Sequence, residues 1–248
     1  MMCRVGIAIV AALLLSAPNV GAGWQQGEFQ AGGKPVSEHH CAPATPGPHP
    51  AVILLYSGLG YANDEDQYED MCLDLAEHGY FVESIEYFTQ TGTSTSFSNS
   101  RGDIANLPIF DREIRSGLDA LAKNPAVDSR REALMGFSLG AYLALSVGGE
   151  EHQRVAAIVE YYGGLFPQFE PLAKDLPPTL ILHGTGDQVV SVSSAHHLDD
   201  LMSLANRPHE IHVYPTLAHG FNFTDGYNRG DWWDRTLEFL KKYLKPET

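Results

Sequence analysis

Residues 136–140 read Gly136-Phe137-Ser138-Leu139-Gly140, a serine held between two glycines. The apolar run 133–135 precedes this stretch, and the helix-like run 141–145 follows it. A strand, a tight turn with a glycine on each side of a serine, and a helix form the pattern of a nucleophile elbow. A side chain at 136 or 140 would collide with the neighbouring strand or helix. The pattern therefore predicts a Ser138 hydroxyl on a strained turn, close to the unpaired N–H groups of a helix N-terminus.

Short apolar runs alternate with stretches of helical spacing on both sides of the elbow. The expected strands are 51–56, 80–86, 131–135, 155–161, 179–183 and 210–214. The expected helices are 64–78, 110–123, 191–205 and 231–244, with a Ser/Thr/Gly-rich loop at 89–106. This alternation predicts one α/β domain over 51–248, in which helices cover both faces of a mostly parallel central sheet. Ligands bind such sheets at the carboxyl ends of the strands.

A serine hydroxyl becomes a nucleophile when a base, usually a histidine oriented by a carboxylate, takes its proton. In this fold the chain order is serine, then carboxylate, then histidine. Asp187 follows the strand 179–183, and His219 follows the last strand, 210–214. Taken singly, Asp187 also fits a turn residue and His219 a surface histidine. Their joint order and position predict a Ser138-His219-Asp187 triad.

A tetrahedral intermediate needs two backbone N–H donors around its oxyanion. The first is expected at Leu139, directly after the serine. The second is expected in the loop after the first core strand, which reads Ser57-Gly58-Leu59-Gly60. We assign it to the N–H of Leu59, with Gly60 as the alternative.

The 248-residue chain has a formal net charge of −15. Nucleic acids and anionic membrane surfaces are disfavoured as partners, because they carry charge of the same sign. No cysteine and histidine cluster has zinc-ligand spacing, so neither a metal nor a cofactor is expected. The expected partner is a small-molecule substrate, and the oligomeric state is left open.

The N-terminus predicts export. Residues 1–22 combine Arg4, an apolar run of eleven residues and a small-residue end at Ala22, which together indicate a signal peptide. Cleavage after Ala22 would leave no membrane span, whereas a retained segment would act as an anchor. Residues 23–50 are expected to form an extended arm before the domain. Export places the mature chain in the periplasm or outside the cell, where Cys41 and Cys72 fit either a disulfide or two buried thiols.

The chain resembles the dienelactone hydrolase family of α/β-hydrolases over about residues 50–245. The matching stretches are Gly136–Gly140, His183-Gly184-x-x-Asp187-x-Val189-Val190 and Tyr214-Pro215-x-x-x-His219-Gly220-Phe221. The spacing from Ser138 to Asp187 and on to His219, 49 and then 32 residues, is also similar to that family. It leaves no room for a large cap domain between Ser138 and Asp187. The resemblance implies the α/β-hydrolase fold and the triad.

The chain departs from the pattern of this family at two places that bear on the substrate. The enzymes that give the family its name use a cysteine nucleophile, and here Ser138 stands in that place. They also hold a substrate carboxylate with arginines, one shortly after the histidine, whereas here the first arginine after His219 is Arg229. Arg101 is the candidate for a positive group at the site. The candidate substrate contacts are Gly60, Arg101, Phe137 and Phe221.

These features predict an exported serine hydrolase that acts on carboxylic esters or lactones through an acyl-enzyme. Two alternatives stay open: a serine exopeptidase on short peptides, and a secreted binding protein with an idle triad.

Overall fold

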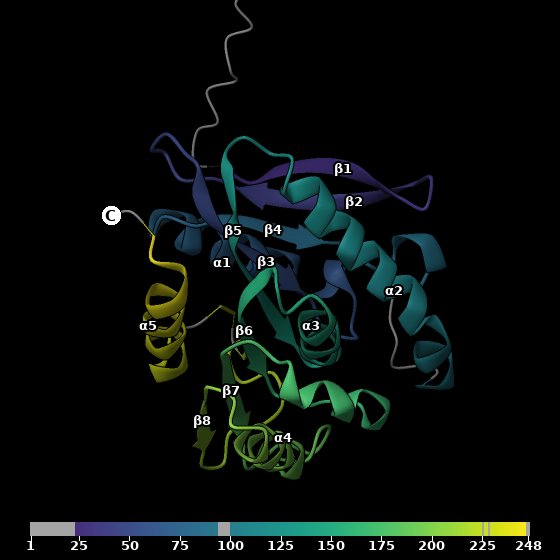
Figure 1. Cartoon of the computed structure of the whole chain (residues 1–248), viewed down its shortest axis with the longest axis vertical. Coiled ribbons are helices and arrows are strands. Elements are labelled where there is room, and N and C mark those ends of the chain that lie inside the picture. Colours follow the sequence, from purple (N-terminus) through teal and green to yellow (C-terminus); the bar gives the residue numbers. More distant parts are fainter. Residues whose placement is uncertain (1–22, 94–99, 225, 228, 247–248) are drawn as a thin grey trace, which may run out of the picture.

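The computed structural model describes residues 23–93, 100–224, 226–227 and 229–246 (Figure 1). The segment 1–22, expected to be a signal peptide, lies outside the described residues. In the described part, eight strands form one sheet in the order β1-β2-β4-β3-β5-β6-β7-β8. The strands are β1 Gln25–Ala31, β2 Lys34–Cys41, β3 His49–Leu55, β4 Phe81–Ile85, β5 Val127–Phe137, β6 Val155–Tyr161, β7 Thr179–Gly184 and β8 His209–Tyr214.

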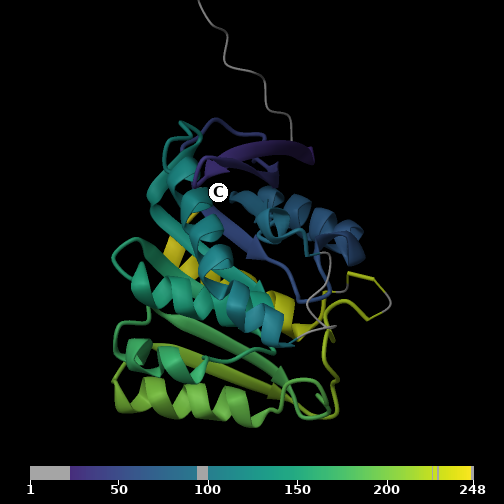
Figure 2. The same cartoon turned by 90° about the vertical axis from the view of Figure 1, so that its right-hand side faces the viewer.

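The sheet is parallel from β4 to β8, and β1 and β2 add an antiparallel edge. Its helices are α1 Glu65–Glu77, α2 Ser100–Leu121, α3 Leu139–Glu150, α4 Ser193–Leu204 and α5 Asp231–Leu244. Helices α1 and α5 lie on one face, and α2, α3 and α4 lie on the other (Figures 1 and 2). Short 3-10 helices occupy Tyr61–Asn63, Thr89–Thr91 and Pro167–Lys174. The predicted single α/β fold with a mostly parallel sheet and helices on both faces is confirmed.

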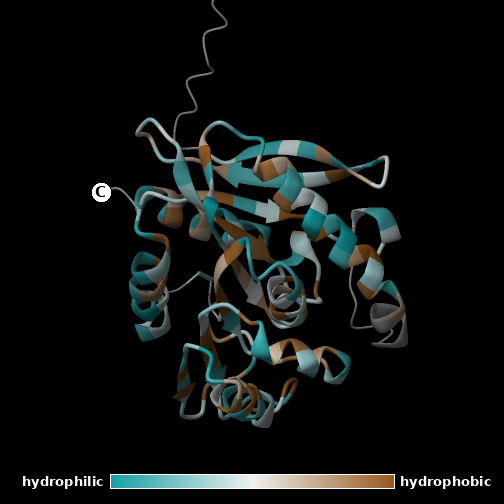
Figure 3. Ribbon diagram, in the orientation of Figure 1, coloured by the Kyte–Doolittle hydropathy of each residue, from teal (hydrophilic) through white to brown (hydrophobic). Residues whose placement is uncertain are grey.

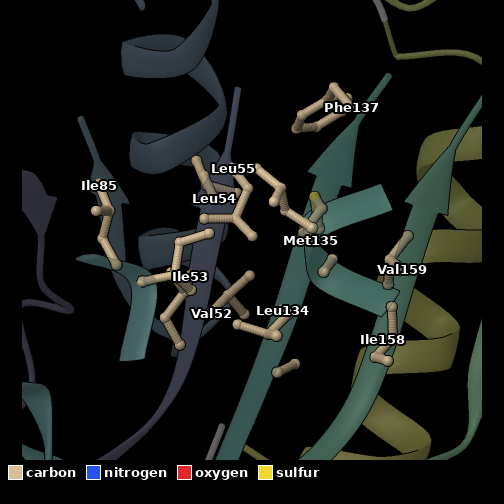
Figure 4. Packing of buried hydrophobic residues seen from close by; sticks show 14 of the residues in the cluster. Val52, Ile53, Leu54, Leu55, Ile85, Leu134, Met135, Phe137, Ile158 and Val159 are labelled. Carbon is tan, nitrogen blue, oxygen red and sulfur yellow. The ribbon is translucent and has the colours of Figure 1, made fainter. Parts of the chain in front are cut away.

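The core lies between the central strands and the two helix layers. Every residue of β3 is buried, as expected for a parallel strand covered on both faces. Aliphatic side chains of β3, β5 and β6 meet there, as Figure 4 shows for Ile53, Leu134 and Ile158. Figure 3 shows hydrophobic residues gathered on these central strands. This rigid centre fixes the strand ends from which the site is built.

The stretch 23–50 is not an extended arm. It contains β1 and β2, which pair as a hairpin through the register Ala31–Lys34 and continue the sheet beside β4. Gly32 and Gly33 form the turn, both with positive φ (58° and 79°), a conformation that glycine adopts without strain. The many Gly, Pro and His residues suggested irregular structure, but the Gly-Gly pair is itself a hairpin signal.

The stretch 89–106 is not entirely a loop. Helix α2 begins at Ser100 and continues through Pro108 to Leu121. Its start therefore lies ten residues before the predicted helix 110–123. Polar and glycine residues at 100–106 hide the first two turns from a search for apolar spacing.

Cys41 and Cys72 form a disulfide, with their Cα atoms 5.8 Å apart. The bond joins the end of β2 to α1, and both cysteines are fully buried. It ties the edge hairpin to the helix that follows the first core strand. Of the two alternatives for this pair, the structure contains the disulfide.

Candidate active site

Ser138 occupies a strained turn between β5 and α3. Its φ is 54°, in a region that residues with a β-carbon rarely adopt. A β-carbon on Gly136 would collide with the Gly140 backbone, and one on Gly140 would collide with the Leu55 carbonyl oxygen. The predicted steric role of both glycines is therefore confirmed, because the turn closes only without those side chains.

Three strand ends bring Ser138, His219 and Asp187 together. Ser138 follows β5, Asp187 follows β7 and His219 follows β8. His219 Nε2 lies 2.9 Å from Ser138 Oγ, and His219 Nδ1 lies 2.7 Å from Asp187 Oδ2. With Nδ1–H donating to the carboxylate, Nε2 is left to accept the serine proton. The arrangement can activate the Ser138 hydroxyl.

Asp187 is held from several sides. Its Oδ1 accepts the backbone N–H groups of Val189 and Val190, at 2.8 Å and 2.9 Å. Its side chain is fully buried, and Oδ2 is also 3.3 Å from Nε2 of His183. These contacts leave Oδ2 directed at His219 and fix the orientation of the carboxylate.

His183 was not among the candidate residues, because it lies inside a strand. Its Nε2–H donates to the Val190 carbonyl at 3.0 Å. Burial lowers the pKa of the His183 imidazole, which favours the neutral ring. A histidine four residues before the Asp187 position is the sequence signal that could have identified this neighbour.

Tyr162 is a second neighbour that the sequence analysis missed. Its ring lies 4.6 Å from the ring of His219, and its hydroxyl donates to Asn222 Oδ1 at 2.7 Å. Tyr162 directly follows β6 and has a positive φ of 45°. Asp187 and His219 were predicted because they follow the carboxyl ends of strands. The same criterion applied to β6 would have identified Tyr162.

The three backbone N–H groups considered as oxyanion donors differ in whether they already donate a hydrogen bond. The N–H of Leu139 has no acceptor among the described residues, whereas the N–H of Leu59 donates to the Ser57 hydroxyl at 3.2 Å. The N–H of Gly60 closes a turn on the Ser57 carbonyl at 3.0 Å. Gly60 therefore serves the turn and does not line the cavity beside Ser138.

A cavity of about 210 Å³ opens beside His219. Its lining residues are Ser57, Leu59, Asp64, Tyr162, His219, Gly220, Phe223 and Thr224. A larger cavity, of about 740 Å³, lies between α1 and α5 and includes none of these residues. Of these two cavities, the smaller one is lined by His219, whose Nε2 lies 2.9 Å from Ser138 Oγ.

The remaining candidate contacts lie elsewhere. Phe137 is fully buried and packs on Tyr161, and Phe221 is buried against Trp232. Both rings belong to the core and not to the cavity wall. The backbone of Arg101 belongs to α2, and its side chain lies outside what the structure describes.

Among the described residues, no group of three or more His, Cys, Asp or Glu side chains is placed to hold a metal ion. Within the same residues, none of the helices has the length and apolar character needed to cross a bilayer.

The fold and the arranged side chains define a hydrolase of the α/β-hydrolase superfamily. The sequence matches the dienelactone hydrolase family over residues 37–244, and the chain belongs to that family. A protein of Yersinia pestis provisionally named a carboxymethylenebutenolidase is 28% identical over 216 residues, which cover 79% of each chain.

Solved structures agree on the fold. A provisionally assigned dienelactone hydrolase from Klebsiella pneumoniae superposes with a TM-score of 0.74 at 23% identity, covering 89% of this chain and all of that one. A dienelactone hydrolase-like promiscuous phosphotriesterase from metagenomic libraries superposes with a TM-score of 0.77 at 19% identity. The match covers 90% of this chain and all of that one.

Larger fungal proteins are more distant relatives. A probable dipeptidyl-aminopeptidase B of Ajellomyces capsulatus is 24% identical over 214 residues, which are 72% of this chain but 23% of that protein. The similarity is therefore confined to a minor part of the peptidase.

Proposed function

We propose that this hydrolase cleaves carboxylic esters or lactones through an acyl-enzyme on Ser138. The observation that carries the proposal is the hydrogen-bonded chain from Ser138 Oγ through His219 to the buried Asp187 carboxylate. The cavity that opens beside His219 supplies room for a substrate next to this chain. The family membership and the order of the three residues support the same reaction class.

In the acylation step, Ser138 Oγ attacks the carbonyl carbon while its proton moves to His219 Nε2. Asp187 keeps Nδ1 protonated and stabilises the imidazolium that forms. The N–H groups of Leu139 and Leu59 donate to the oxyanion, for which Leu59 must exchange its long hydrogen bond to the Ser57 hydroxyl. Collapse of the intermediate breaks the ester bond, and the leaving alkoxide takes the proton from His219.

In the deacylation step, water attacks the acyl carbon and gives its proton to His219 Nε2. The second tetrahedral intermediate uses the same two N–H donors. It collapses to the free acid, and the proton returns from His219 to Ser138 Oγ. One ester and one water thus yield one acid and one alcohol.

A serine exopeptidase on short peptides is the second candidate, because a probable dipeptidyl-aminopeptidase B is among the relatives. A panel of short acyl esters and amino-acyl amides separates the two activities.

We also propose that the mature chain acts in the periplasm or outside the cell. Two features support this: the signal-like sequence 1–22 and the disulfide between Cys41 and Cys72, a bond that persists in oxidising compartments. Fractionation of cells that produce the full chain, with N-terminal sequencing of the product, tests both the location and cleavage after Ala22.

The central test compares Ser138→Ala with the unchanged protein. We expect hydrolysis of short p-nitrophenyl esters to fall by about 10⁴-fold or more, and covalent labelling by a fluorophosphonate to disappear. Ser203→Ala, at an exposed position on α4, is the matched control and should retain both. Turnover that survives in Ser138→Ala would overturn the acyl-enzyme, and labelling without ester turnover would point to a different substrate class.

A further inference from the structure

The cavity beside His219 contains a carboxyl group and no described Lys or Arg. Asp64 contributes the carboxyl, while Leu59 and Phe223 supply apolar walls. Arg229 is directed elsewhere, because its Nε lies 3.0 Å from Asp74 Oδ2. The described part of the cavity is therefore negative where a site for a substrate carboxylate would be positive.

Asp64 does not have the usual role of an aspartate at this position. It immediately precedes α1, where an aspartate normally accepts a hydrogen bond from a helix N–H. The Asp64 side chain makes no such bond, and its Oδ1 instead accepts Asn63 Nδ2–H at 2.8 Å. The carboxyl group is thus a wall of the cavity rather than a helix cap.

Asp64 lines the same cavity as Tyr162 and His219. Burial raises the pKa of the Tyr162 phenol most, and the carboxylates of Asp64 and Asp187 raise it further. Burial also raises the pKa of the Asp64 carboxyl itself. No ion pair joins Asp64 to a Lys or Arg anywhere in the described part of the chain. A cation bound in the cavity would supply the missing positive charge.

We propose that Asp64 selects esters that carry a small cationic group, such as a quaternary ammonium, and disfavours esters that carry a carboxylate. The inference rests on the proposed ester hydrolysis at Ser138. The apolar walls lower the local dielectric and strengthen the attraction, and the ring of Phe223 favours a cation over an anion. The volume of about 210 Å³ limits the group to a small one. The net charge of −15 attracts cations during encounter.

Three acetate esters of similar size test the proposal. Acetylcholine is cationic, neohexyl acetate replaces its ammonium nitrogen by carbon, and acetoxypropanoate is anionic. Acid release is followed in a pH-stat at about pH 8, where an ordinary aspartate is ionised. We expect kcat/KM for acetylcholine to exceed that for neohexyl acetate by about tenfold, with acetoxypropanoate slowest.

Variants assign the preference to Asp64. In Asp64→Asn, the ratio between acetylcholine and neohexyl acetate should fall to about one, because the amide is similar in shape and uncharged. Glu65→Gln removes the adjacent, exposed carboxylate outside the cavity and should keep the ratio. If circular dichroism shows that Asp64→Asn does not fold, the proposal is still tested by the order of kcat/KM for the three esters with the unchanged protein.

Three outcomes would overturn the proposal. One is a retained ratio in Asp64→Asn, and another is equal or faster hydrolysis of acetoxypropanoate than of neohexyl acetate. The third is a loss of acetoxypropanoate turnover in Arg101→Gln that leaves neohexyl acetate unaffected, which would assign the selection to a positive group. Turnover of neohexyl acetate without charge preference overturns this inference alone, whereas no Ser138-dependent turnover of any ester overturns the proposed function as well.

Discussion

The imidazole of His183 and the carboxylate of Asp187 lie 3.3 Å apart, and neither side chain is exposed to solvent. His183 Nε2 and His219 Nδ1 thus contact the same carboxylate oxygen of Asp187, Oδ2. Asp187 also accepts two backbone N–H groups, so its carboxylate has little freedom to turn. An Asp187 held in this way can control which nitrogen of His219 carries the proton.

Replacement of Asp187 by asparagine should lower kcat by about 10³- to 10⁴-fold with a much smaller change in KM, because the amide no longer holds the productive His219 tautomer. Steady-state kinetics on a short ester measure the effect. Asp199→Asn breaks a comparable pair, with His209 at 2.9 Å, on the surface of α4 and should leave kcat unchanged. A loss below about tenfold in Asp187→Asn would contradict the proposed role.

Loss of the disulfide should destabilise the fold without altering the chemistry. The bond between Cys41 and Cys72 closes a loop with a sequence separation of 31. The chain-entropy relation assigns about 3–4 kcal/mol of stability to such a loop. We expect the double variant Cys41→Ala/Cys72→Ala to unfold at correspondingly lower urea concentration, while kcat of the folded fraction stays the same. Equal midpoints for the two proteins would show that the bond constrains little of the unfolded chain.

Glu160 should make the protein less stable as the pH rises. Its carboxyl is fully buried near the end of β6, and Oε2 accepts the Gly163 N–H at 2.8 Å. Burial raises its pKa from the ordinary value of 4.5 to about 8. Between these two values the folded chain keeps a proton that the unfolded chain has lost. The free energy of unfolding therefore falls by up to about 1.4 kcal/mol per pH unit in that window and levels off above it.

Glu160→Gln isolates this contribution, because glutamine has a similar shape and does not titrate. Urea unfolding from about pH 5 to about pH 9 should show a flatter pH dependence for the variant. Buried Glu83, whose pKa is also raised by burial, leaves part of the slope in place. If the free energy of unfolding changes equally with pH in the unchanged protein and in Glu160→Gln, Glu160 does not hold the extra proton of the folded state.

The fold was largely predictable from the sequence, because a buried parallel strand must be a continuous apolar run. The strand 155–161 and the helix 231–244 were predicted with their observed bounds. The hairpin 25–41 was not, because its half-exposed strands carry polar residues and their pairing depends on β4, a partner distant in the chain.

The site was predictable only where topology determines position. Ser138, Asp187 and His219 each follow a strand, so their meeting depends on the order of strands alone. The cavity wall depends on how side chains pack. Phe137 and Phe221 were therefore predicted to contact the substrate, although their rings do not line the cavity. Asp64 does line it, but from the sequence it could not be told from a helix cap.

The two halves of the chain contribute different parts of the site. Ser138, Asp187 and His219 follow β5, β7 and β8, whereas Leu59 and Asp64 lie in the connection between β3 and α1. The three side chains proposed to break the bond and the carboxyl proposed to choose the substrate are thus inherited through separate segments of the gene. A change at Asp64 can redirect the enzyme to a new substrate during evolution while Ser138, Asp187, His219 and the Leu59 N–H are kept. Asp64 is therefore the natural target for a designed library.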